Sequence, residues 1–145
     1  MFIKSFHSHW IIFSVTALVL ASCKTDDTRT LAEKGDPTAQ YELGVMYQNG
    51  EGLPQNYSKA VKWFRMAAEQ GNTTAQLSLA RMYDRGNGVP QNDLSAYMWA
   101  NLAASGGLEK AETFSDILRQ KITKKQIAEA ERLSKEWVKK RAKKQ

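Results

Sequence analysis

Apolar side chains recur along the chain at the three- and four-residue spacing of an amphipathic helix, most clearly in two successive stripes. The first stripe consists of Ala39, Leu43, Met46 and Tyr47, and the second of Ala60, Trp63, Phe64 and Ala67. Between them, Gly50 is placed to end a helix in the left-handed conformation, and Pro54 prevents the helix from continuing. The pattern predicts a helix over residues 37–49, a glycine-containing turn, and a second helix closed by Gly71.

The two stripes and the turn return 36 residues later. The matching positions are Ala39-Gln40 with Ala75-Gln76, Leu43 with Leu79, Tyr47 with Tyr83, Gly50 to Asn56 with Gly86 to Asn92, Ala60 with Ala96, Trp63 with Trp99, and Gly71 with Gly107. Self-similarity at a period of about 20–50 residues is typical of solenoids, whose units bury their apolar faces by stacking on one another. We therefore expect an all-α solenoid of helix pairs.

Two positions within the repeat carry more local information. Asn56 is placed to cap the second helix of its unit. Gly44 and Ala80 occupy the same position within the first helix of each unit. Glycine in a helix costs about 1 kcal/mol relative to alanine, so we expect the second helix to approach closely there, with Trp63 or Trp99 packed over the gap.

The third stretch departs from the repeat because no glycine turn follows its first stripe. That stripe consists of Leu108, Ala111, Phe114 and Leu118. Thr123 and Gln126 then form a capping-box pattern that opens another helix. The apolar face of this helix consists of Ile127, Ala130, Leu133 and Trp137. Solenoids need terminal units with a polar outer side, so we interpret residues 108–140 as a C-terminal cap.

Three motifs carry a family resemblance: A-Q-x-x-L-G/A-x-x-Y, G-x-G-V/L-P-Q-N and A-A-x-x-G-x-x-x-A. Over residues 31–111 the chain resembles the Sel1-like repeat family, a relative of tetratricopeptide repeats. The resemblance implies a short right-handed helix-pair solenoid. It places two full repeats and partial flanking units in residues 31–121, and a C-terminal capping helix with a basic tail in residues 122–145.

The first residues have the order of an export signal. The first ten contain one cation, Lys4, and no acid, and residues 11–20 are almost wholly apolar. Ten residues span about 15 Å as a helix, about half of a bilayer core, which disfavours a membrane-spanning helix. Leu20-Ala21-Ser22-Cys23 resembles a bacterial lipobox, which implies removal of residues 1–22, lipidation of Cys23 and a tether over residues 23–30. The resemblance also implies a sorting rule of Gram-negative lipoproteins, by which Asp after the cysteine retains the protein at the inner membrane, so Lys24 at that position favours the outer membrane, facing the periplasm.

Composition restricts the chemistry of the mature chain. Cys23 is the only cysteine, and both histidines, His7 and His9, lie in the predicted signal. Without histidine or a free thiol, Cys–His and Ser–His nucleophile pairs and zinc sites of these ligands are excluded. We therefore expect that the protein binds no metal and no cofactor and that it is not an enzyme. A carboxylate site formed by two of Glu42, Glu51 and Asp84 in one cleft would revive the alternative of an envelope hydrolase.

Repeated aromatic residues and glycine turns have plain structural explanations. Tyr47, Tyr83, Trp63 and Trp99 recur on faces predicted to be buried, so we expect them to pack in the core rather than to form a stacking surface. The glycine turns lack the spacing of phosphate-binding loops, so we expect them to serve only as turns.

Charge is spread unevenly over the chain. Residues 121–145 contain ten Lys or Arg and three Glu, whereas residues 23–120 contain ten Lys or Arg and twelve Asp or Glu. A cationic patch is predicted at Lys139, Lys140, Arg141, Lys143 and Lys144. It is either a solvated helix face, a surface for anionic lipid or lipopolysaccharide, or a contact for an acidic protein. The predicted compartment disfavours nucleic acid.

A groove is the predicted binding site, because the first helix of each unit lines the inner face of related solenoids. The positions opposite its core stripe are Tyr41, Val45 and Gln48 in the first unit, and Leu77, Arg81 and Asp84 in the second. They differ between the units, which suits recognition of an unknown protein or peptide partner. The favoured hypothesis is a lipid-anchored interaction module of adaptor, regulator or toxin-immunity type. The alternative is a structural envelope protein whose basic helix binds anionic lipid or peptidoglycan.

Overall fold

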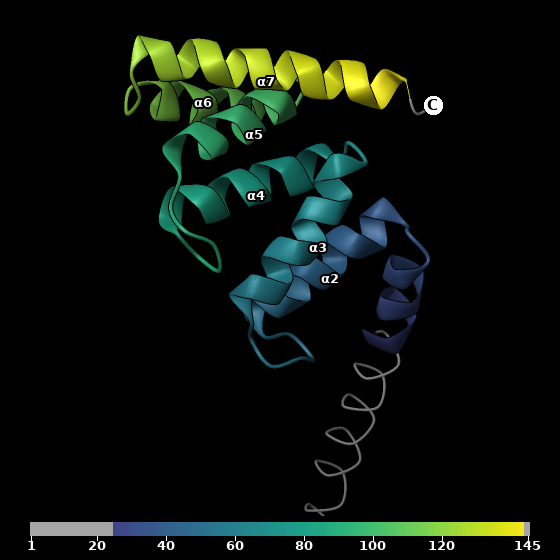
Figure 1. The fold of residues 1–145 in the computed structure, drawn as a ribbon. Coiled ribbons are helices and arrows are strands. Elements are labelled where there is room, and N and C mark those ends of the chain that lie inside the picture. Colours follow the sequence, from purple (N-terminus) through teal and green to yellow (C-terminus); the bar gives the residue numbers. More distant parts are fainter. Residues whose placement is uncertain (1–24, 144–145) are drawn as a thin grey trace, which may run out of the picture.

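The computed structural model describes residues 25–143, and every regular element in that range is a helix. A helix over residues 25–33 is followed by α2 (Pro37–Asn49), α3 (Tyr57–Glu69), α4 (Thr73–Arg85), α5 (Asp93–Ser105), α6 (Glu109–Arg119) and α7 (Lys124–Ala142). Successive helices stack from the purple N-terminal helix to the yellow α7 in Figure 1. The all-α helix-pair solenoid is confirmed, and α2 has the predicted bounds.

Polar side chains at the helix starts fix where the helices begin. In α3 the side chain of Asn56 accepts a hydrogen bond from the backbone N–H of Lys59, and Asn92 does the same for Ser95 in α5. Such caps satisfy backbone donors that the helix itself leaves unpaired. Gly50, with φ of 75°, ends α2 in the left-handed region, which alanine would adopt only under strain. The predicted cap and turn are therefore confirmed.

The core is built from the repeated apolar positions. Phe64 and Leu79 are fully buried, and Trp99 is 7% exposed. Trp63 and the repeated tyrosines, Tyr47 and Tyr83, are partly buried and packed against the core, as predicted. The residue that fills the space beside Gly44 is Phe64 rather than Trp63, so that part of the prediction was wrong.

A buried glutamine joins each repeat to the helix before it. Gln40 is 2% exposed, and its Nε2 donates a hydrogen bond of 3.1 Å to the backbone oxygen of Ala32. Gln76 is 3% exposed and donates one of 3.2 Å to Ala68. Both acceptors lie at helix ends, where carbonyls lack a partner within the helix. The repeated Ala-Gln pair thus marks the junction between stacked units.

The C-terminal cap does not reproduce the helix pair of the repeats. The capping box of Thr123 and Gln126 is present at the start of α7, as predicted. However, α7 packs chiefly against α5, where Trp137 meets Trp99 edge-to-face with ring centroids 6.0 Å apart. The short connection before Thr123 replaces the glycine turn of the repeats, and α7 covers the end of the solenoid.

The segment before the repeats differs from the expected tether. Residues 25–33 are helical, and Ala32 within this helix is fully buried. The helix continues through residues 31–33, where the resemblance placed the start of the partial first unit. The predicted signal of residues 1–22 and Cys23 lie outside the described residues. Within residues 25–143 no helix is both long and apolar enough to cross a membrane.

Candidate functional site

The first helices of the two repeats jointly line a pocket of about 460 Å³. Tyr41 from α2 and Arg81 from α4 both contribute to it, and Leu77 from α4 is a third lining residue. A smaller hollow of about 90 Å³ continues along the same face, lined by Gln48 and Arg81. Together these form what we call the inner groove, with Tyr41 and Gln48 from α2, Ser78, Arg81 and Arg85 from α4, and Glu109 and Lys110 from α6.

Packing beneath the groove holds its main side chains in place. The ring of Tyr41 lies against Phe64 with centroids 5.8 Å apart, so its position is set by the core. The guanidinium of Arg81 lies 5.8 Å from the centre of the Phe114 ring, within the range of a cation–π contact. Arg81 is otherwise exposed. The groove therefore presents an anchored phenol on one side and an accessible cation on the other.

Three of the six predicted groove residues have other roles. Leu77 is 5% exposed and packs with Ala103 and Ala111, so it contributes to the core. Asp84 accepts a hydrogen bond of 2.7 Å from Nζ of Lys121, which fastens the turn before α7 to α4. Val45 lines a different pocket, at the N-terminal end of the solenoid.

The groove contains residues that the helical spacing did not indicate. Ser78 lies one position beyond Leu77, and Glu109 and Lys110 come from the third unit. Extending the 36-residue period would have found Lys110, since it corresponds to Thr74 of the same pocket. Arg81, Arg85 and Lys110 against Glu109 give the groove a net positive charge.

The family comparison matches the Sel1 repeat to residues 37–72 and 73–108. The chain contains two Sel1 repeats. The boundaries coincide with the α2–α3 and α4–α5 pairs and with the period read from the sequence. Proteins built from Sel1 repeats generally bind protein partners rather than act as enzymes.

Solved structures with Sel1 repeats have the same fold. A protective antigen of uropathogenic Escherichia coli strains is 33% identical, with a TM-score of 0.77 over 83% of this chain. A Sel1 repeat protein from Oxalobacter formigenes is 42% identical, with a TM-score of 0.62 over 63% of this chain. The chain spans about a quarter of each, since it covers 26% of both proteins. Comparison with curated proteins gave no significant match.

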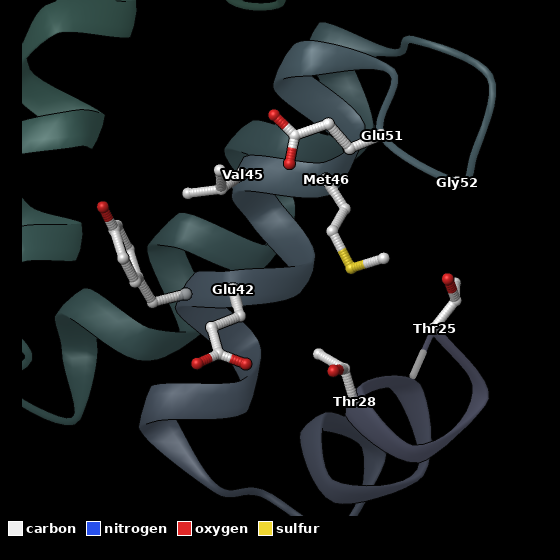
Figure 2. A pocket seen from close by; sticks show the side chains of 8 residues that line it. Thr25, Thr28, Glu42, Val45, Met46, Glu51 and Gly52 are labelled. Atoms are coloured by element: carbon white, nitrogen blue, oxygen red, sulfur yellow. The ribbon is translucent and has the colours of Figure 1, made fainter. Parts of the chain in front are cut away.

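Beside the first Sel1 repeat lies a second pocket, of about 410 Å³, which we call the N-terminal pocket. Two of the three carboxylates that bear on the hydrolase alternative, Glu42 and Glu51, line it together (Figure 2). Both are exposed, and Glu51 accepts a hydrogen bond from the Asn49 side chain. A general acid at neutral pH usually needs burial or a close charged neighbour, and these exposed positions provide no enclosure. Among residues 25–143 no cluster of His, Cys, Asp and Glu could hold a metal ion.

The predicted cationic patch on α7 is only partly free. Lys139, Lys140 and Lys143 are exposed. The Arg141 guanidinium lies 5.6 Å from the centre of the Trp137 ring and covers Gly71, whose missing Cβ would lie within 2.3 Å of its atoms. Arg141 therefore helps to hold α7 on the Sel1 repeats. Lys144 lies outside the described residues.

Proposed function

We propose that this chain is a lipid-anchored adaptor of the bacterial envelope that binds a protein or peptide in the inner groove. The observation that carries the proposal is the pocket shared by Tyr41 and Arg81, which come from consecutive Sel1 repeats. Because Tyr41 and Arg81 come from different repeats, a partner can contact both side chains only when the two repeats are stacked. The phenol offers apolar area with a polar end, and Arg81 offers several hydrogen-bond donors to a carboxylate.

The charge of the groove indicates the chemistry of the partner. Arg81, Arg85 and Lys110 outnumber the one acidic residue, Glu109. An acidic or polar segment would be attracted to this surface, whereas a basic one would be repelled. The pocket and the smaller hollow share Ser78 and Arg81, so together they extend over more of the surface than either does alone, which suits an extended or helical peptide.

Lipid anchoring is the second part of the proposal and is supported by the sequence of residues 11–23. Residue 25, two positions after Cys23 along the chain, already belongs to a helix that packs into the first unit. An anchored chain would therefore hold its repeats close to the membrane. Lys24 favours the outer membrane, with the repeats facing the periplasm.

The proposal is tested by capture from envelope extract with two matched variants. Arg81→Glu with Lys110→Glu reverses two exposed groove charges, and Lys34→Glu with Lys62→Glu makes the same charge change at exposed positions elsewhere. We expect one protein to be captured by the wild-type chain and the Lys34/Lys62 variant but not by the groove variant. Equal capture by all three would contradict the groove assignment.

The structural alternative keeps one supporting observation, the exposed Lys139, Lys140 and Lys143 on α7. In that case the chain would bind anionic vesicles, and about 0.5 M salt would release it because the contact is a screened surface attraction. Replacing these three lysines by glutamine would abolish that binding. If the same variant still captures the groove partner, the two functions are separate.

A further inference from the structure

The N-terminal pocket is bordered by three consecutive segments of the chain. It is lined by Tyr41, Glu42, Val45 and Met46 of α2, by Glu51 and Gly52 of the following turn, and by Thr25 and Thr28 of the helix before it. Figure 2 shows Met46 extending from α2 toward the two threonines. The pocket therefore lies between the first helix of one repeat and the second helix of the unit before it.

The equivalent place in the next unit is covered by a helix of the chain itself. Thirty-six residues after Thr25, Thr28, Tyr41 and Met46 come Val61, Phe64, Leu77 and Met82. All four are buried, with at most 5% exposure. Part of their cover is α2, since its Tyr41 lies against the Phe64 ring. Its Val45 and Tyr47 also pack against the core cluster that includes Val61, Phe64 and Met82. At the N-terminal end Thr25 and Thr28 are also buried, with 5% and 7% exposure, whereas Tyr41 and Met46 remain partly exposed and border a pocket of about 410 Å³.

Side chains in the pocket differ from their buried counterparts in a way that suits a separate partner. Two threonines replace Val61 and Phe64, which makes the pocket less apolar than the core. Tyr41, Val45 and Met46 form an apolar centre that remains partly exposed. A surface of mixed character can be hydrated when empty and still bury apolar area when filled.

Charge defines which helix would fit. Glu42 and Glu51 lie at the pocket, and among its described lining residues none is basic. The helix over residues 25–33 adds Asp26, Asp27 and Glu33 against Arg29 alone. The inner groove has the opposite sign. A helix with an apolar stripe and flanking lysine or arginine matches the N-terminal pocket and would be disfavoured in the groove.

We propose that the N-terminal pocket binds a basic amphipathic helix of a partner protein, in the position over Tyr41 and Met46 that α2 has over the next unit. The inference rests on the proposed function only in treating the chain as an interaction module. A helix of 13 residues, the length of α2, is roughly 20 Å long and would span the N-terminal pocket. If Cys23 is lipidated, the pocket begins two residues from the membrane anchor, where basic amphipathic helices accumulate.

The probe for this site is a synthetic peptide of the α2 sequence, residues 37–49, labelled with fluorescein. One version carries Thr38→Lys and Glu42→Lys, and the matched version carries Thr38→Glu and keeps Glu42. Both have the same apolar residues and differ only in charge. Fluorescence anisotropy with the full 145-residue chain then measures the affinity of each peptide.

Three variants of the chain make the result specific. We expect the basic peptide to bind about tenfold more tightly than the acidic one, and Glu42→Gln with Glu51→Gln to remove most of that difference. Met46→Lys should abolish binding. Arg81→Glu, in the inner groove, should leave it unchanged. The carboxylate variant involves only exposed side chains, so it remains informative if Met46→Lys fails to fold.

Other outcomes would overturn the proposal. Equal affinity for the two peptides, or no binding of either, would reject a basic helix as the occupant. Self-association of the chain in sedimentation, lost in the Met46 variant, would assign the pocket to a second copy. Binding only after removal of residues 1–22 would assign it to the chain's own first residues. Peptide binding without capture of a groove partner would leave this inference intact and contradict the proposed function.

Discussion

The Cβ atom that Gly44 lacks would lie 2.6 Å from Cδ1 and Cε1 of Phe64. In the second repeat the same two positions are Ala80 and Ala100, both fully buried. A glycine faces a large ring in one repeat, and two small buried side chains occupy the same positions in the next. In each helix pair the sizes of the two side chains at this contact are therefore complementary. A comparison of one position at a time between the repeats does not show this relationship.

Gly44→Ala is expected to destabilise the chain although alanine favours helix. The added methyl group would overpack the contact with Phe64, at a cost of about 1–3 kcal/mol in the free energy of unfolding. Urea denaturation measures this cost. In a Phe64→Ala background the same substitution should be nearly neutral, and a Gly44→Ala cost independent of residue 64 would contradict the contact.

Replacing Gln76 should weaken the junction between the two repeats. Gln76→Leu removes one donor to the Ala68 carbonyl, which keeps its hydrogen bond from the Gly71 N–H, so we expect a cost of about 0.5–1.5 kcal/mol. Gln91→Leu in the exposed turn is the control and should change stability by less than about 0.5 kcal/mol. If Gln76→Leu and Gln91→Leu lowered the free energy of unfolding by the same amount, the hydrogen bond at the junction would not contribute to stability.

Tyr97 should make the chain less stable at alkaline pH. Burial raises its pKa above the ordinary 10.0, and Glu131 beside its hydroxyl acts in the same direction. Above pH 10 the Tyr97 hydroxyl of the unfolded chain loses its proton, whereas that of the folded chain keeps it. The contribution of Tyr97 to the free energy of unfolding is therefore complete below pH 10 and declines as the pH rises toward the folded pKa.

Urea denaturation of wild type and Tyr97→Phe at increasing pH checks this expectation. The variant should lose less stability than wild type between about pH 9 and about pH 11. Tyr57→Phe, at a side chain that is 38% exposed, should follow the wild-type curve. Parallel curves for wild type and Tyr97→Phe would contradict the raised pKa.

Two substitutions at the N-terminus address the anchor. Cys23→Ser should abolish incorporation of labelled palmitate and release the chain from the membrane fraction, because the thiol is the only site for the lipid. Lys24→Asp should keep the label but move the chain to the inner membrane. Membrane association that survives Cys23→Ser without label would refute lipid anchoring.

The sequence predicted the local structure well because the signals are local. Gly50 and Asn56 act on neighbouring backbone groups, and the apolar stripes define which helix faces are buried. The 36-residue recurrence gave the repeat boundaries without any tertiary information. Most of the helix over residues 25–33 was predicted as a tether, and only residues 31–33 fall in the predicted partial unit, since this segment lacks most of the repeated positions.

The misplaced residues are those whose surroundings come from distant parts of the chain. Leu77 is buried by α5 and α6, and Asp84 is paired with Lys121, 37 residues away. Neither partner could be deduced from the spacing within α4. The change of direction at Thr123, which brings α7 onto α5, determines both the cap and the position of Arg141 over Gly71.

The most direct test of the groove is site-specific photo-crosslinking in cells. A photoreactive amino acid at Ser78 lies in the inner groove, and one at the exposed Lys62 of α3 is the matched control. We predict a discrete cross-linked adduct with one envelope protein from position 78 and none from position 62. The same adduct from both positions, or an adduct only from position 62, would contradict partner binding in the inner groove.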